Sequence, residues 1–164
     1  MTKSFFVTAT GTDIGKTLAT AALVHQLRAS KKTVTAVKPI ACGEPQDTKI
    51  LMQALGEKDF QKISPFHFKE PISPHLAAAR EKKKISLREV VKASQPNQKT
   101  DYHFIEGVGG MMVPLTEKET VLDWIKATKY PVILVAGTYL GSFNHTLMSI
   151  KILEKEKIKL RAVI

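Results

Sequence analysis

The feature that most constrains the fold of this chain is a strand, a glycine-containing loop and a helix that follow one another near its start. Residues 4–8 are aromatic and β-branched, as in a buried strand, and residues 16–29 carry alanine and leucine at helical spacing. From the end of the strand to the start of the helix the sequence reads Thr8-Ala9-Thr10-Gly11-Thr12-Asp13-Ile14-Gly15-Lys16-Thr17. Backbone N–H groups of such a loop, with the positive end of a helix behind them, bind phosphate groups. In this setting we expect Lys16 to contact the β- and γ-phosphates of a nucleotide and the Thr17 hydroxyl to bind Mg²⁺.

This phosphate loop is a variant, because Thr10 stands where the strict pattern G-x-x-x-x-G-K-[ST] has its first glycine. The alternative interpretation is a glycine turn that merely caps a helix. The strand before the loop and the helix after it favour phosphate binding, since a chance Gly-Lys-Thr triplet would lack that context.

Strand-like and helix-like segments alternate along the rest of the chain. The predicted strands are 33–37, 102–105 running into 106–110, 131–136 and 160–164. Four further helices are predicted. The first is capped by Asp47 and ends at Gly56, and the second begins with the capping box Ser86–Glu89. The third begins at Thr120–Asp123, and the fourth runs through residues 147–153. The proline-rich residues 64–79 predict a long loop that leads into a short alanine-rich helix. This alternation predicts an α/β fold, a P-loop NTPase-like three-layer α/β/α arrangement with a mostly parallel sheet, in a single domain over residues 1–164.

Charge and composition narrow the classes of partner. Lys and Arg number 25 against 15 Asp and Glu, a formal net charge of +10 over 164 residues, which raises nucleic acid as a partner. The lysines are dispersed, however, and no aromatic-lined basic strand accompanies them, so we expect no nucleic-acid binding. No apolar run reaches the ~18 residues of a membrane span, so we also expect no membrane partner. The single cysteine, Cys42, favours a reducing, cytoplasmic setting.

Three charged residues stand at or near the predicted carboxyl ends of strands. Glu106 ends an apolar strand, Lys38 directly follows another, and Asp47 lies a few residues further on. The carboxyl ends of parallel strands share one edge of a sheet, so all three are candidates to lie beside the phosphate loop. Each also has a plainer interpretation: a solvated strand end for Glu106, a surface lysine for Lys38 and a helix cap for Asp47.

Four separated blocks of sequence resemble dethiobiotin synthetase, the ATP-dependent enzyme family that closes the ureido ring in biotin synthesis. The blocks are the loop ending Gly15-Lys16-Thr17, then Lys38-Pro39-Ile40-Ala41-Cys42-Gly43, then Glu70-Pro71-Ile72-Ser73-Pro74-His75-Leu76-Ala77-Ala78, then Glu106-Gly107-Val108-Gly109-Gly110 with Pro114-Leu115 after it. A weaker fifth block is Leu140-Gly141-Ser142-Phe143-Asn144-His145. The second and third blocks are the more specific, because a phosphate loop alone is common to many ATPases.

The resemblance implies a reaction and a set of residues. The implied reaction is the carboxylation of 7,8-diaminononanoate with CO2 and its ring closure to dethiobiotin, using ATP and Mg²⁺ in a homodimer. The implied catalytic residues are Lys38, Lys16 and Thr12, and the implied metal ligands are Thr17, Asp47 and Glu106. The implied nucleotide-binding residues are Asp13, Ile14, Gly15, Lys16, Thr17, Leu18, Asp47, Glu106, Gly107, Val108 and Gly109. The implied substrate contacts are Lys38 and Cys42 and, from the partner's copy, Gly141, Ser142 and Asn144.

Among the departures from the family pattern, two bear directly on the expected activity. Cys42 stands where the family usually has a Ser or Thr, so a weak thiol donor replaces a hydroxyl. Family members also continue beyond the segment at 160–164, which leads us to expect a C-terminally truncated chain. Two alternatives therefore stay open: a regulatory or partitioning P-loop ATPase of the same fold, and a truncated form with impaired nucleotide binding.

Overall fold

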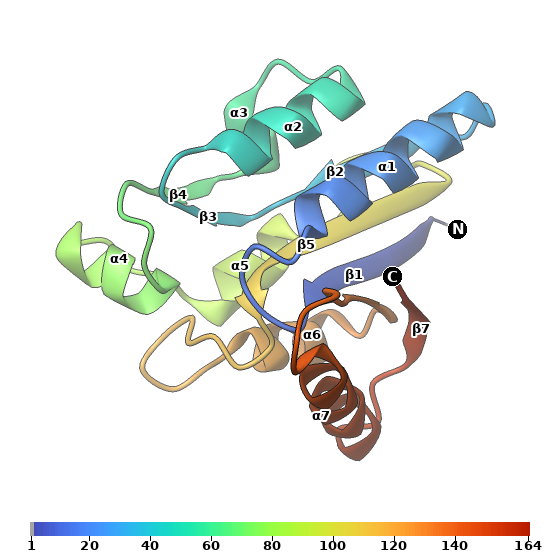
Figure 1. Cartoon of the computed structure of the whole chain (residues 1–164). Helices are drawn as coiled ribbons and strands as arrows, with labels where there is room; N and C mark the ends of the chain where they lie inside the picture. Colours follow the sequence, from blue (N-terminus) through green and yellow to red (C-terminus); the bar gives the residue numbers. More distant parts are fainter. Residues whose placement is uncertain (1) are drawn as a thin grey trace.

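A five-stranded parallel sheet forms the centre of the molecule (Figure 1). The computed structural model describes residues 2–164. The strand order is β2-β5-β1-β6-β7, and the strands are β1 (Lys3–Ala9), β2 (Val34–Val37), β5 (Tyr102–Gly110), β6 (Val132–Val135) and β7 (Leu160–Val163). Every neighbouring pair in this sheet is parallel, with Phe5 opposite Phe104 and Phe6 opposite both Ile105 and Val132. The predicted mostly parallel sheet is confirmed.

Helices cover both faces of the sheet, because the side chains of β1 alternate between two cores (Figure 1). Val7 and Ala9 pack toward α1 (Lys16–Ala29) and α2 (Gln46–Leu55). Phe6 points the other way, toward α5 (Leu87–Ala93), α6 (Val121–Thr128) and α7 (Ser142–Lys155). There its ring meets the fully buried Trp124 edge-on, with ring centroids 4.8 Å apart. The three-layer α/β/α arrangement is therefore confirmed.

Several polar side chains form hydrogen bonds inside the core that contains Phe6 and Trp124. The indole N–H of Trp124 donates to Ser94 Oγ at 2.8 Å, and the Ser94 hydroxyl donates to the Val90 carbonyl at 2.7 Å. The ring of His103 bonds the Ser94 carbonyl at 3.0 Å and the Thr35 hydroxyl at 2.8 Å. Burial lowers the pKa of His103, although the hydrogen bond to the Ser94 backbone works against it.

A second, two-stranded sheet was not predicted. It pairs β3 (Ile40–Cys42) with β4 (Phe66–Phe68) in parallel, and the short helices α3 (Phe60–Ile63) and α4 (Pro74–Arg80) flank β4. The alanine-rich helix after the prolines is confirmed as α4, but the expectation of an unbroken loop before it is wrong. Pro39 has no N–H and separates β2 from β3, while its carbonyl accepts a bond from Phe66 N at 3.0 Å.

The helix starts bear out two of three predicted caps. Ser86 and Thr120 cap α5 and α6, and Thr120 with Asp123 forms a complete capping box. Asp47 does not cap α2: the residue before this helix is Pro45, and Asp47 lies in the first turn, where its carboxylate pairs with Lys38 instead. None of the helices within residues 2–164 combines the length and the apolar character that a bilayer crossing requires.

Candidate active site

The carboxyl edge of the sheet brings the predicted residues of three strands together. The phosphate loop follows β1, and Lys38 follows β2. Glu106 lies inside β5 and not at its end, because the strand continues as far as Gly110. This corrects the prediction of a strand ending at Glu106. The register between β5 and β1 shifts between Val7 and Ala9 of β1, just before the phosphate loop begins.

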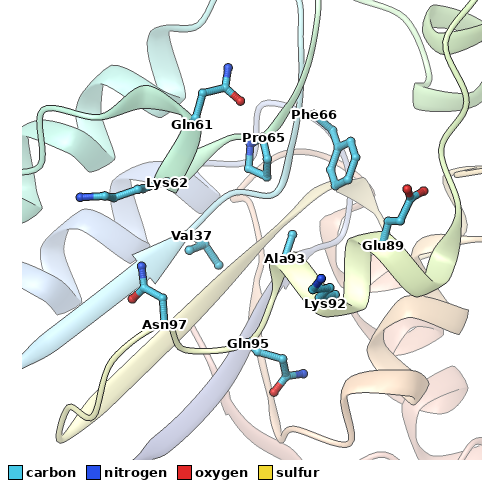
Figure 2. Close-up of a pocket in the computed structure, with 10 residues that line it drawn as sticks. All are labelled: Val37, Gln61, Lys62, Pro65, Phe66, Glu89, Lys92, Ala93, Gln95 and Asn97. Atoms are coloured by element: carbon cyan, nitrogen blue, oxygen red, sulfur yellow. The ribbon is translucent and has the colours of Figure 1, made fainter.

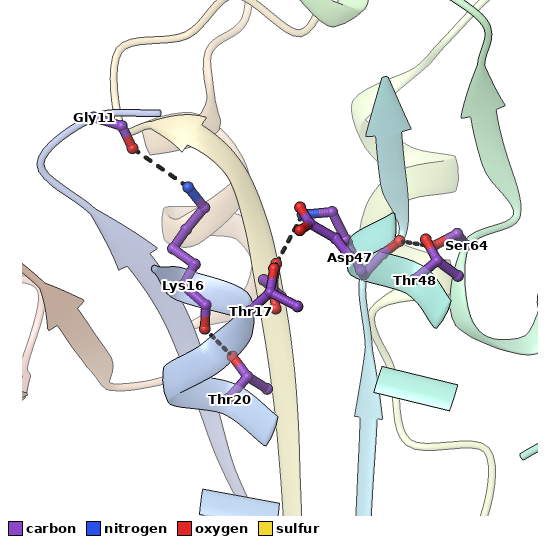
Figure 3. Close-up of polar contacts among 9 residues, drawn as sticks. Gly11, Lys16, Thr17, Thr20, Asp47, Thr48 and Ser64 are labelled. Atoms are coloured by element: carbon purple, nitrogen blue, oxygen red, sulfur yellow. Dashed lines mark hydrogen bonds and ion pairs between the residues drawn. The ribbon is translucent and has the colours of Figure 1, made fainter. Parts of the chain in front are cut away.

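The phosphate loop presents free backbone N–H groups at the start of α1. Gly15 precedes the helix with a left-handed backbone (φ +96°), a conformation that a residue with a Cβ adopts only under strain. No side chain within residues 2–164 caps the helix, so its first N–H groups stay available to an anion. Lys16 is almost fully buried, and its Nζ lies 3.3 Å from the Gly11 carbonyl (Figure 3).

A buried group of charges lies beside the loop. Lys38 Nζ is 2.7 Å from Glu106 Oε1 and 2.8 Å from Asp47 Oδ2, so one ammonium is shared between two carboxylates. The Thr17 hydroxyl, from the first turn of α1, donates to the same Glu106 Oε1 at 2.5 Å. The Glu106 side chain is fully buried and that of Lys38 is 6% exposed, whereas Asp47 is half-exposed. The sequence could place these residues at one edge, but only the fold shows that they form one cluster.

The charges in this cluster shift one another's ionisation. Burial alone would lower the pKa of Lys38, but the neighbouring carboxylates of Glu106 and Asp47 outweigh it and raise the pKa above its ordinary value. Burial would raise the pKa of Asp47, yet the charge of the Lys38 ammonium and its contact with the Asp47 carboxylate lower it overall. Burial lowers the pKa of Lys16, and repulsion from Lys38 lowers it further. The site thus favours the charged form of Lys38 and disfavours the charged form of Lys16. An anion bound beside Lys16 would favour its charged form again.

A cavity of about 360 Å³ opens over this cluster and the phosphate loop. Most of the predicted residues line it: Thr12, Asp13, Gly15, Lys16, Thr17, Leu18, Lys38, Cys42, Asp47, Val108 and Gly109. Ile14, Glu106 and Gly107 are not among the residues that line it. Burial raises the pKa of the Cys42 thiol to about 11, so Cys42 meets the cavity as a neutral group.

Three predicted substrate residues lie elsewhere in the chain. Gly141, Ser142 and Asn144 stand at the start of α7, outside the lining of this cavity. A site built from one copy of residues 2–164 therefore lacks them.

The glycines after Glu106 are needed for packing of the protein itself. A Cβ at Gly107 would lie 2.9 Å from Cε1 of Phe6, in the core. Gly109 has a left-handed backbone (φ +58°), and a Cβ there would lie 2.7 Å from Val113 Cγ2. Close approach to Phe6 and Val113 explains both glycines without reference to a ligand.

The donors of the cluster suit a hard cation that also binds phosphate. Within residues 2–164, no group of three or more His, Cys, Asp or Glu side chains is placed to hold a metal by itself. The cluster instead offers two carboxylates and the Thr17 hydroxyl, and Glu106 Oε2 is buried with no hydrogen-bond partner. Mg²⁺ is characteristically held by one or two carboxylates together with substrate phosphates and water, so this oxygen-only set fits it.

A slightly larger cavity, of about 420 Å³, lies apart from the phosphate loop between α3, β4 and α5 (Figure 2). Its rim carries Lys62, Glu89 and Lys92, and none of the residues of the phosphate loop lines it. The charged cluster, and not cavity size, identifies the site.

Sequence reasoning missed two residues that support the cluster from behind. Ser64 and Thr48 are both fully buried, and their hydroxyl oxygens are 2.8 Å apart (Figure 3). No motif marks either residue, because Ser64 becomes a neighbour of Lys38 only when the segment before β4 folds against it.

Comparison with known sequences finds relatives that are about 40% identical to this chain. The family described as an AAA domain matches residues 3–164. The ATP-dependent dethiobiotin synthetase BioD of Methylobacterium nodulans is 40% identical, over 98% of this chain and 79% of its own length. The protein of the same name from Legionella pneumophila strain Philadelphia 1 is 42% identical, over 96% of this chain and 76% of its own length.

Comparison with solved structures finds the same fold at low sequence identity. The kinase domain of the Escherichia coli tyrosine kinase ETK matches with a TM-score of 0.58 at 15% identity, covering 98% of this chain and 66% of its own. A putative plasmid partition protein from Borrelia burgdorferi, bound to AMPPNP, matches with a TM-score of 0.54 at 13% identity, covering 99% and 73%. These similarities concern the fold alone.

Proposed function

Because the chain belongs to the dethiobiotin synthetase family, we propose that it is an ATP-dependent ligase that converts 7,8-diaminononanoate and CO2 to dethiobiotin. The observation that carries the proposal is the ammonium of Lys38, buried between Asp47 and Glu106 beside the phosphate loop. Such a reaction creates and moves negative charge on carbamate and phosphate oxygens. A permanently charged, fixed lysine at that place is the group that stabilises it.

The proposed reaction has three steps, and each has a task for this chain. One amine of the diamine adds to the carbon of CO2 and releases a proton, which gives a carbamate. A carbamate oxygen then attacks the γ-phosphorus of ATP, ADP leaves, and a carbamic–phosphoric anhydride forms. The second amine attacks the anhydride carbon, phosphate leaves with its electron pair, and the ring closes with loss of a proton. Lys38 stabilises the carbamate and the transferring phosphoryl group, with Lys16 and Thr12 next to it.

The phosphate loop binds the nucleotide in this proposal. The backbone of residues 13–18 contacts the phosphates, and the low exposure of Lys16 strengthens its attraction to them. Thr17, Asp47 and Glu106 would hold Mg²⁺, which would supply neutralisation of the phosphate charge. Val108 and Gly109 of β5 line the cavity, and in this proposal their backbone contacts the ligands. Cys42 contributes its neutral thiol to the diamine site.

We also infer a homodimer, because the family is homodimeric and α7 leaves a large apolar surface uncovered. Leu140, Phe143, Leu147 and Met148 are all exposed, and Phe143 is 85% exposed. An apolar group of this kind is characteristic of an interface. In a dimer, Gly141, Ser142 and Asn144 of one copy would close the diamine site of the other. Light scattering should give twice the chain mass, and Phe143→Ser with Leu147→Ser should give a monomer.

We place the reaction in the cytoplasm, where a free thiol such as Cys42 stays reduced. The alternative of a regulatory or partitioning ATPase is not favoured, because the relatives at 40% identity are dethiobiotin synthetases.

The proposed function is tested by phosphate release. Release from MgATP should depend on both the diamine and bicarbonate. Lys38→Ala should lose turnover by at least about 100-fold while its ATP affinity changes little, because Lys38 acts on the transferring group. Phosphate release that does not respond to the diamine would contradict the proposal.

A further inference from the structure

We propose that Ser64, with Thr48 behind it, is a positioning residue that fixes Lys38 for phosphoryl transfer. The proposal rests on the function proposed above and extends it to residues outside the cavity. Neither hydroxyl lines the cavity over the phosphate loop, so neither residue is a ligand contact. Both act through Lys38 and the first turn of α2.

The main chain of Lys38 is held on both sides by one short segment. Its N–H donates to the Ile63 carbonyl at 2.9 Å, and its carbonyl accepts the Ser64 hydroxyl at 2.7 Å. Pro39, next in the chain, provides no donor to hold this bend between β2 and β3. The Ser64 hydroxyl therefore takes the place of a backbone donor at the residue that carries the ammonium.

The direction of each hydrogen bond follows from its partner. A carbonyl only accepts, so the single proton of the Ser64 hydroxyl is committed to Lys38. Between Thr48 and Ser64, 2.8 Å apart, Thr48 must then be the donor. The result is a chain of two bonds from Thr48 through Ser64 to the Lys38 carbonyl. Both hydroxyls are fully buried, so water cannot replace either one.

The first turn of α2 therefore contacts the ammonium of Lys38 directly and its carbonyl through Ser64. Asp47 contacts the ammonium at 2.8 Å, and the adjacent Thr48 reaches the carbonyl through Ser64. The two holds differ in kind. Asp47 and Glu106 are also the proposed metal ligands, so a bound cation would compete with the ammonium for them. The hydrogen bond from Ser64 involves no proposed metal ligand, and it would hold the main chain of Lys38 in place whether or not a cation is bound.

Loss of this anchor should lower the rate more than the affinity. A displacement of about 1 Å in a charge-stabilising group can cost on the order of 100-fold in rate. For Ser64→Ala we expect kcat to fall about tenfold or more, with the KM for ATP changed less than about threefold, because the phosphate loop is untouched. Thr48→Val, which removes the hydroxyl at nearly constant volume, should lower kcat less, and Thr48→Ser should restore it.

The matched control is Ser94→Ala. Ser94 is another fully buried serine whose hydroxyl donates to a carbonyl, that of Val90, at 2.7 Å, but it lies under α6 away from the site. It should lower the thermal midpoint as Ser64→Ala does, and its kcat per folded enzyme should equal that of the wild type.

The experiment measures diamine-dependent phosphate release at a temperature well below the melting transition of every variant. A fall in kcat for Ser64→Ala but not for Ser94→Ala supports the proposal, as does recovery of Thr48→Ser relative to Thr48→Val. Equal kcat in Ser64→Ala and the wild type, or an equal loss in Ser94→Ala, overturns it. If Ser64→Ala does not fold, the two Thr48 variants decide, and equal rates for them overturn the proposal. A wild-type enzyme without diamine-dependent activity would contradict the proposed function itself, so the two failures are distinguishable.

Discussion

Replacing Lys38 with methionine should destabilise the protein in the absence of nucleotide, because it leaves the buried carboxylate of Glu106 without its counter-ion. The two groups are 2.7 Å apart, with side chains 6% and 0% exposed. Removing one partner of a buried pair costs roughly 3–5 kcal/mol. The Thr17 hydroxyl still donates to Glu106, so we expect the lower end, a loss of about 3 kcal/mol at pH 8. For a domain of this size that is a fall of about 6–12 °C in Tm.

A second substitution distinguishes this mechanism from a general packing loss. Adding Glu106→Gln to Lys38→Met should recover most of the stability, because a neutral amide leaves no unpaired charge.

Urea denaturation at pH 8 measures the loss in Lys38→Met and its recovery in the double variant. The control is Lys62→Met, at an exposed ion pair in which the Nζ of Lys62 lies 3.4 Å from Glu57, and it should leave the midpoint unchanged. The reasoning is refuted if Lys38→Met is as stable as the wild type at pH 8, or if Glu106→Gln brings no recovery.

Three further predictions concern single residues. Since burial keeps the pKa of His103 below its ordinary 6.5, the unfolded chain binds more protons between the two values; the urea midpoint should therefore fall as pH drops below about 6.5, and His103→Gln should flatten that dependence. Because the pKa of Cys42 is about 11 and not 9.0, iodoacetamide labelling at pH 8 should be about 100-fold slower than for an ordinary exposed thiol, as mass spectrometry can follow. Gly43→Ala should lower stability in thermal melts by roughly 1–3 kcal/mol, since Gly43 has φ +86° and a new Cβ would lie 2.9 Å from Cβ of Pro71; an unchanged melting temperature would contradict this.

Local patterns explain the part of the fold that the sequence could predict. The apolar strand, the glycine loop and the helix around Gly15 are contiguous, so their order alone places the phosphate loop. The helix caps at Ser86 and Thr120 depend on residues three positions apart, and the structure has both at the starts of α5 and α6. Parallel topology then places Lys38 near the loop without any knowledge of side-chain positions.

Long-range contacts explain what the sequence could not predict. The strands β3 and β4 have three residues each, too few for a period of two to stand out, and they form by pairing with each other, with Ile40 opposite Phe66. Asp47 looked like a helix cap because its type and position suit one, yet the nearby ammonium of Lys38 competes for its carboxylate. The anchor at Ser64 has no local signal, because it depends on how the segment between α3 and β4 folds against Lys38.

The most direct test of the proposed function is the fate of isotopically labelled bicarbonate. With the diamine and MgATP present, the label should appear in an acid-stable product with the mass of dethiobiotin, with one ADP formed for each labelled carbon. Lys38→Ala should form neither product at a comparable rate. ADP formed without incorporation of the label, or at a rate indifferent to the diamine, would contradict the assignment of this site to carboxylation and ring closure.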